Sequence, residues 1–142
     1  MNNYTFSDIS VGMKEEFEVI ITSDLMNKFF EITNDCNPMH HNDEYAISKG
    51  YKGRIAFGML VSSFLSTLAG VYLPGENCII HSVEVKFKNP VYVNDKLTVS
   101  GTVKSIDERF QTIELQINIT NQNSEKVVRG TMICGVIGKE NE

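Results

Sequence analysis

The stretch that decides the fold is IAFGMLVSSFLSTLAGVYL, residues 55–73, which contains no charged residue. Apolar side chains fall on nearly every side of a helix drawn from Ala56 to Tyr72, and Pro74-Gly75 then provides a stop. A helix that is apolar on all sides belongs in the interior of a protein. The sequence therefore predicts a long central helix over 56–72 that the rest of the chain must cover.

The same stretch is close to the length that crosses a bilayer. Its composition argues against that interpretation, because Ser62, Ser63, Ser66 and Thr67 lie inside it and Arg54 directly precedes it. We therefore expect no membrane-spanning segment.

Downstream of this helix the hydrophobic period changes to two, which is typical of half-buried strands. Val83, Val85 and Phe87 alternate with charged and polar residues until Asn89-Pro90, and residues 113–119 alternate strictly. Two further segments, 97–103 and 127–137, complete a set of four predicted strands. Turns at 94–95 and 121–124 separate these strands.

Upstream, the sequence predicts one strand and two shorter helices. Residues 17–21 alternate between apolar and polar, and Thr22-Ser23-Asp24 then offers the N-cap of a helix. Asn37-Pro38 ends that helix. Asn42-Asp43-Glu44 caps a second, short helix and places its acidic residues favourably for the helix dipole.

Together these elements predict an α+β fold, a single hot-dog domain over residues 1–142 in which an antiparallel five-stranded sheet wraps the long central helix. The chain has 142 residues, 42% of them apolar, which is enough for one core without disulfides or metals. An isolated five-stranded sheet has free edges that favour pairing with another strand. We therefore expect a homodimer.

Charge and chain start narrow the classes of function. Lys and Arg total 13 against 18 Asp and Glu, a net charge of −5 with no basic run, which argues against nucleic acid or an anionic membrane as a partner. Residues 1–5 carry no positive cluster followed by an apolar stretch, so we expect no targeting signal and a cytoplasmic location. Cys36, Cys78 and Cys134 form no CxxC pair and are interpreted as free thiols.

The densest group of polar residues lies between the two short helices, in the segment Thr33-Asn34-Asp35-Cys36-Asn37-Pro38-Met39-His40-His41-Asn42. Asn-Pro forces a turn between Asp35 and His40, so that a carboxylate and an imidazole can converge on one water and share its proton. The alternative is that Asp35 is a turn residue and that His40 or His41 caps the next helix. Four convergent ligands are not evident, and we predict no metal site.

The segment from Phe29-Phe30 to Ala46 resembles the signature of the MaoC-like dehydratases, among them the R-specific enoyl-CoA hydratases (hydratase 2). That signature runs aromatic, aliphatic, small residue, Gly-Asp, any residue, Asn-Pro, aliphatic, His, five residues, then Ala or Ser. This chain supplies in register Phe30, Ile32, Thr33, Asp35, Asn37, Pro38, Met39, His40 and Ala46. The resemblance extends through the long helix and the strand that opens at His81, and it includes the hot-dog layout.

The resemblance implies a hydro-lyase that adds water across the trans-2 double bond of an enoyl thioester to give the (R)-3-hydroxyacyl product, or that removes it. Asp35 and His40 would be the catalytic pair. The backbone N–H of Gly58, at the start of the central helix, would polarise the thioester carbonyl. Asn37 would orient the loop that carries His40, and Ser63 matches a family serine near the pair. No cofactor is implied, since coenzyme A belongs to the substrate.

The chain departs from the family pattern at two positions. Asn34 stands where the family usually has a glycine before the catalytic aspartate, and Phe57 stands where it often has a histidine before Gly58. A glycine at the first position suggests a positive φ that turns Asp35 out of the helix and toward His40. Because Asn tolerates this conformation best among residues with a side chain, we predict a positive φ at Asn34.

Three functions stay open. The first is hydration or dehydration of an acyl-CoA, and the second is the same reaction on a thioester held by a carrier protein. Basic side chains that would contact either the phosphates of coenzyme A or an acidic carrier protein are Lys49, Lys52, Arg54, Lys86 and Lys88. The third is a non-catalytic acyl-thioester-binding hot-dog protein, against which the intact pair of Asp35 and His40 argues.

Overall fold

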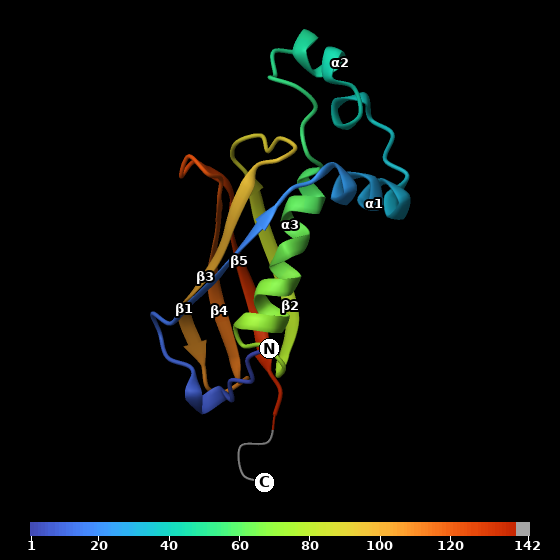
Figure 1. Ribbon diagram of the computed structural model, residues 1–142. Coiled ribbons are helices and arrows are strands. Elements are labelled where there is room, and N and C mark those ends of the chain that lie inside the picture. Colours follow the sequence, from blue (N-terminus) through green and yellow to red (C-terminus); the bar gives the residue numbers. More distant parts are fainter. Residues whose placement is uncertain (139–142) are drawn as a thin grey trace.

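An antiparallel sheet that curves around one helix dominates the structure, as the computed structural model of residues 1–138 shows (Figure 1). Its strands are β1 (Lys14–Ile20), β2 (Cys78–Phe87), β3 (Lys96–Asp107), β4 (Thr112–Thr120) and β5 (Lys126–Val136). They lie in the order β1-β3-β4-β5-β2, and each neighbouring pair is antiparallel. The predicted α+β hot-dog fold and its five strands are confirmed, while residues 139–142 of the predicted domain lie outside the described residues.

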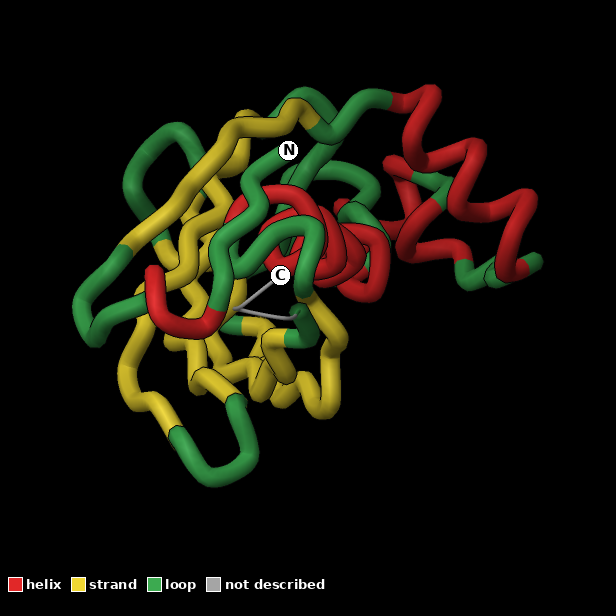
Figure 2. The backbone as a smooth tube through the Cα atoms, turned by 90° about the horizontal axis from the view of Figure 1, so that it is seen from below, coloured by secondary structure: helices red, strands yellow, loops and turns green. Residues whose placement is uncertain are grey.

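Helix α3 (Gly58–Thr67) lies inside the curve of the sheet and continues through a π-helical turn, Leu68–Tyr72. Figure 2 shows the strands passing around one side of this helix. Leu65 and Leu68 are buried in the core that the helix shares with the inner face of the sheet. Gly101 of β3 permits this close packing, because a Cβ at that position would lie 2.9 Å from Cδ2 of Leu68.

The central helix differs from the prediction at its start and in its coverage. It begins at Gly58 rather than Ala56, because Ala56 is held in the loop by a hydrogen bond from its N–H to the carbonyl of Val91 at 2.7 Å. It is not covered on all sides, since the sheet reaches only one side and leaves Met59 66% exposed. Within residues 1–138, no helix is long and apolar enough to cross a membrane.

Two short helices, α1 (Ser23–Thr33) and α2 (Asp43–Ser48), project beyond the sheet near the start of α3 (Figure 1). The predicted caps are confirmed: the Thr22 hydroxyl accepts from the N–H of Leu25 at 3.1 Å, and the Asn42 side chain accepts from the N–H of Tyr45 at 3.0 Å. A single 3₁₀ turn, Pro38–His40, lies between them. We call the region from α1 to α2, residues 23–48, the overhang. It places the polar segment 33–42 near the start of α3.

Strand β2 forms one edge of the sheet, with β5 as its neighbour on the other side. Four large apolar side chains of this edge are well exposed: Ile79 at 48%, Ile80 at 38%, Val83 at 48% and Phe87 at 51%. An edge strand with apolar side chains is a site at which another strand can pair.

Candidate active site

Asn34 ends helix α1 and turns the chain toward the candidate site. Its φ of 57° lies in the left-handed region, and its N–H donates to the carbonyl of Phe30 at 2.7 Å as a C-cap. The positive φ predicted at this position is confirmed. Because the helix stops here, four residues before Pro38, the side chain of Asp35 lies on a loop and not on a helical face.

The loop from Asp35 to His40 is held by its own side chains. Oδ1 of Asp35 accepts from the N–H of Asn37 at 3.1 Å, and Oδ1 of Asn37 accepts from the N–H of Met39 at 3.0 Å. Asn37 therefore caps the 3₁₀ turn that carries His40. One carboxylate oxygen of Asp35 is engaged in the loop, and the other is directed to the imidazole of His40.

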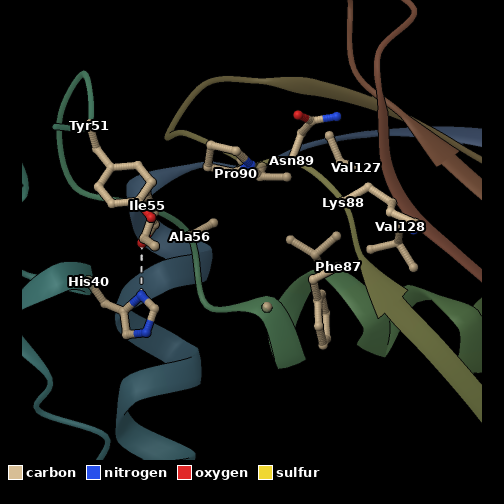
Figure 3. Close-up of a pocket in the computed structure, with 13 residues that line it drawn as sticks. His40, Tyr51, Ile55, Ala56, Phe87, Lys88, Asn89, Pro90, Val127 and Val128 are labelled. Atoms are coloured by element: carbon tan, nitrogen blue, oxygen red, sulfur yellow. Dashed lines mark hydrogen bonds between the residues drawn. The ribbon is translucent and has the colours of Figure 1, made fainter.

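His40 is fixed in position and in tautomer. Its Nδ1 lies 2.9 Å from the carbonyl oxygen of Ile55, so Nδ1 must carry the proton of that hydrogen bond (Figure 3). The Nε2 atom lies 4.0 Å from Oδ2 of Asp35. In the neutral imidazole, Nε2 is thus the atom with a free lone pair, and it faces the carboxylate.

Aromatic contacts hold the two histidines against the core. The ring of Phe57 packs on that of His40 with centroids 4.3 Å apart. His41 packs edge-on against Phe30 at 4.8 Å, and its Nε2 donates to the carbonyl of Asp35 at 2.8 Å. Phe57, where the family often has a histidine, therefore serves here as an apolar support for His40. The contacts of His41 with Phe30 and with the Asp35 carbonyl are not predicted by the sequence, because they depend on the fold of the overhang.

Gly58 is the first residue of α3, and its amide points out of the helix start. Among residues 1–138, no group accepts a hydrogen bond from this N–H. It borders two hollows that both include His40. The structure therefore brings three of the predicted groups together: the Asp35 carboxylate, the His40 imidazole and the Gly58 amide.

The first of the two hollows, which we call the apolar hollow, has a volume of about 300 Å³. Besides His40 and Gly58, its walls include Ala56, Val61, Val91 and Val128, and Figure 3 shows His40 and Phe87 on opposite sides of it. The second, which we call the Asp35 hollow, measures about 240 Å³ and includes Asp35, Thr33 and Met59. Phe87 borders both hollows, a placement that strand periodicity does not reveal.

Ser63 is not brought to this site. Its hydroxyl donates to the carbonyl of Leu60 at 2.6 Å, back along its own helix, and it lines neither hollow. Helical serines commonly satisfy their hydroxyl in this way.

The basic residues considered for carrier recognition are dispersed. Lys88 borders the apolar hollow, and Lys52 and Arg54 border an adjoining polar depression of about 700 Å³ that also contains Asp43 and Asp95. Lys86 belongs to a separate depression near Arg129, and Lys49 lies 5.4 Å from the ring of Tyr45. Basic and acidic side chains are thus mixed in the depression next to the apolar hollow. Within the described chain, no group of three or more His, Cys, Asp or Glu side chains is placed to hold a metal ion.

A hot-dog domain that brings a carboxylate, an imidazole and a free helix-terminal amide to one end of its central helix has the layout of a hydro-lyase. The family model described as the MaoC like domain matches residues 7–125, and the chain belongs to this family. The family and the class of enzyme predicted from the sequence are thereby confirmed.

Individual proteins similar to this chain are named as hydratases or dehydratases. The chain is 32% identical over 119 residues to an (R)-specific enoyl-CoA hydratase of Rhodospirillum rubrum, with 82% of this chain and 83% of that one covered. It is 31% identical over 87 residues to a mitochondrial 3-hydroxyacyl-[acyl-carrier-protein] dehydratase of Arabidopsis thaliana, covering 61% and 50%. The unliganded R-hydratase PhaJ1 from Pseudomonas aeruginosa superposes with a TM-score of 0.90 at 27% identity, covering 96% and 88%.

Proposed function

We propose that this protein catalyses the R-specific hydration of trans-2-enoyl-CoA to (R)-3-hydroxyacyl-CoA, or the reverse dehydration, with Asp35 and His40 activating one water. The observation that carries the proposal is the 4.0 Å separation of His40 Nε2 and Asp35 Oδ2, with Nδ1 already committed to Ile55. A water that donates to both atoms spans a gap of roughly 4–4.5 Å when each hydrogen bond is about 2.8 Å long.

In the hydration direction, the Nε2 lone pair of His40 takes one proton from the bound water, while the Asp35 carboxylate accepts a hydrogen bond from the other hydrogen, which stays on the oxygen. The water oxygen then bonds to C3 of the enoyl group, and the electron pair of the double bond moves toward the thioester oxygen. The imidazolium returns its proton to C2 on the same face, which restores the carbonyl and completes a syn addition. Positioned acid–base catalysis of this kind contributes about 10²–10⁴-fold.

The amide of Gly58 would stabilise the charge that develops on the thioester oxygen. It lies at the N-terminus of α3, where the helix dipole favours negative charge, and it has no acceptor within residues 1–138. A preorganised donor of this kind contributes about 10²–10³-fold in the transition state.

The second candidate is dehydration of a 3-hydroxyacyl thioester on a carrier protein. Two observations favour it: the likeness to the Arabidopsis thaliana carrier-protein dehydratase, and Lys88 in the wall of the apolar hollow. The chemistry at Asp35, His40 and Gly58 would be the same, and only the carrier would differ.

We further infer a homodimer that forms through the free edge of β2. This edge exposes Ile80 and Val83, and Met59 near the start of α3 is exposed as well. Apolar side chains beside an unpaired strand edge are covered most simply by a second copy of the same edge.

The proposal is tested with purified protein, crotonyl-CoA and the matching crotonyl-carrier-protein, by following the loss of the enoyl-thioester absorbance. We expect loss with crotonyl-CoA, and a product that an (R)-specific but not an (S)-specific 3-hydroxyacyl-CoA dehydrogenase oxidises. Loss with the carrier-protein substrate alone would establish the second candidate. No loss with either would indicate a non-catalytic binding protein and would overturn the proposal.

A further inference from the structure

The last residue of β2, Phe87, lies where the two hollows of the site meet. Three residues border both hollows: His40, Gly58 and Phe87. Asp35 borders one hollow, and the valines border the other. The three shared residues therefore form a neck between the proposed water site and the apolar hollow.

Phe87 packs directly against the start of α3. A Cβ built on Gly58 would lie 3.0 Å from Cε1 and 3.3 Å from Cδ1 of the Phe87 ring. The ring thus occupies the space beside the Gly58 α-carbon, and Figure 3 shows it across the hollow from His40. A methyl group at position 58 fits there only if the ring shifts by a few tenths of an ångström.

Three other aromatic walls, His40, Phe57 and Phe29, are fixed by partners. The ring of His40 is held by the Ile55 carbonyl and by Phe57, which in turn packs on Phe29 with centroids 5.0 Å apart. Phe87 is 51% exposed, and among the residues that the structure describes its ring makes no contact with another ring or with a cation. Phe87 is therefore a wall that can be changed without disturbing the proposed catalytic pair.

The position of the reacting atoms follows from the proposed function, on which this inference rests. The thioester oxygen lies at the Gly58 amide, and C3 lies at the water between Asp35 and His40. Atom C2 is bonded to the thioester carbon and to C3, so it must lie in the neck, against the ring of Phe87.

We propose that Phe87 is a specificity-determining residue that selects enoyl thioesters with hydrogen on C2 and rejects those with a methyl branch there. A methyl group on C2 would meet the ring that already contacts the helix start, so the ring must move to receive it. One methyl group in such a site changes specificity by about 10–200-fold.

The test compares kcat/KM for crotonyl-CoA with that for tiglyl-CoA, the same enoyl thioester with a methyl group on C2. In Phe87→Ala, we expect the kcat/KM for tiglyl-CoA divided by that for crotonyl-CoA to rise at least tenfold over the wild-type value. Phe87→Leu, which keeps an apolar side chain on the strand, gives an intermediate ratio. The matched control is Phe110→Ala in the β3–β4 turn, where the phenylalanine is 65% exposed and borders neither hollow, and the ratio stays at the wild-type value.

A binding measurement separates this inference from the proposed function. Butyryl-CoA and 2-methylbutyryl-CoA cannot be hydrated, and calorimetry gives the Kd of each for the same variants. We expect Phe87→Ala to improve the relative affinity for the branched analogue at least tenfold. If the wild type hydrates crotonyl-CoA but neither ratio moves in a folded Phe87→Ala or Phe87→Leu, the role of Phe87 is wrong and the function stands. If the wild type hydrates nothing, the function fails, and the ratio of Kd values alone decides the role of Phe87.

Discussion

The Nδ1 atom of His40 and the carbonyl oxygen of Ile55 lie 2.9 Å apart, and this hydrogen bond joins the overhang to the segment that leads into α3. A second bond, from the N–H of Ile55 to the carbonyl of Met39 at 2.9 Å, runs in the opposite direction. The loop that carries the imidazole and the helix start that carries the Gly58 amide are therefore held in a fixed relative position, by one side chain–backbone bond and one backbone–backbone bond. The partner of His40 does not depend on the identity of a side chain at position 55.

The first prediction concerns the proposed catalytic pair. Asp35→Asn and His40→Asn each lower kcat for crotonyl-CoA by at least about 10²-fold, because both groups act on the same water. The double variant is about as inactive as either single one, since residues that act as a unit are not additive.

The control for this pair is Asp24→Asn, because Asp24 is exposed on α1 and borders neither hollow of the site. Its kcat stays near the wild-type value. A double variant far slower than both single variants would show that Asp35 and His40 act independently.

The second prediction isolates the amide of Gly58. Proline is tolerated at the first position of a helix, where its missing N–H has no intrahelical partner, and Phe57 already has an extended ψ of 124° that suits a residue before proline. Gly58→Pro therefore keeps α3 and deletes the donor.

Gly58→Ala is the matched variant, because it adds the same Cβ beside Phe87 but retains the N–H. Relative to Gly58→Ala, we expect kcat to fall by about 10²–10³-fold in Gly58→Pro at similar melting temperatures. Equal activity of the two variants would remove Gly58 from the proposed mechanism.

The third prediction concerns the left-handed residue before Asp35. Asn34→Gly keeps close to full activity, because glycine adopts the observed φ of 57° without strain. Asn34→Val lowers the free energy of unfolding by roughly 1–3 kcal/mol or displaces Asp35, because a β-branched side chain fits this conformation poorly.

Turnover and melting temperature distinguish these effects. Asn94→Val serves as the control, since Asn94 has a φ of 76° in the turn before β3 and lies outside the loop of Asp35. It should lower the melting temperature without the same loss of turnover. An Asn34→Val variant as stable and active as Asn34→Gly would contradict the backbone explanation.

The fourth prediction concerns the proposed dimer. Val83→Lys on the free edge of β2 converts the protein to a monomer at micromolar concentration in light scattering, because a buried unpaired ammonium group is costly. Val11→Lys is the control, since Val11 is 64% exposed and lies before β1. A wild type that is already monomeric, or a Val83→Lys variant that remains dimeric, would place the interface elsewhere or exclude it.

Much of the fold is determined by sequence pattern alone. The strict alternation of 113–119 and the apolar run of 55–73 fix a strand and a buried helix, because the periods of two and 3.6 decide which side chains share a face. The caps at Thr22 and Asn42 and the left-handed Asn34 are equally local, since they depend on the short-range preferences of one residue and its neighbours. These are the features that the structure confirms.

Contacts between distant segments required the tertiary structure. The bond from His40 to Ile55, the packing of Phe87 against Gly58 and the support of His40 by Phe57 join residues that no periodicity relates. For Ser63 the family resemblance predicted a position near Asp35 and His40. In the structure its hydroxyl instead donates to the carbonyl of Leu60 in its own helix. Sequence determined which residues could carry the chemistry, and the folded chain decided which of them meet, since side-chain convergence depends on how the overhang, the sheet edge and the helix start pack together.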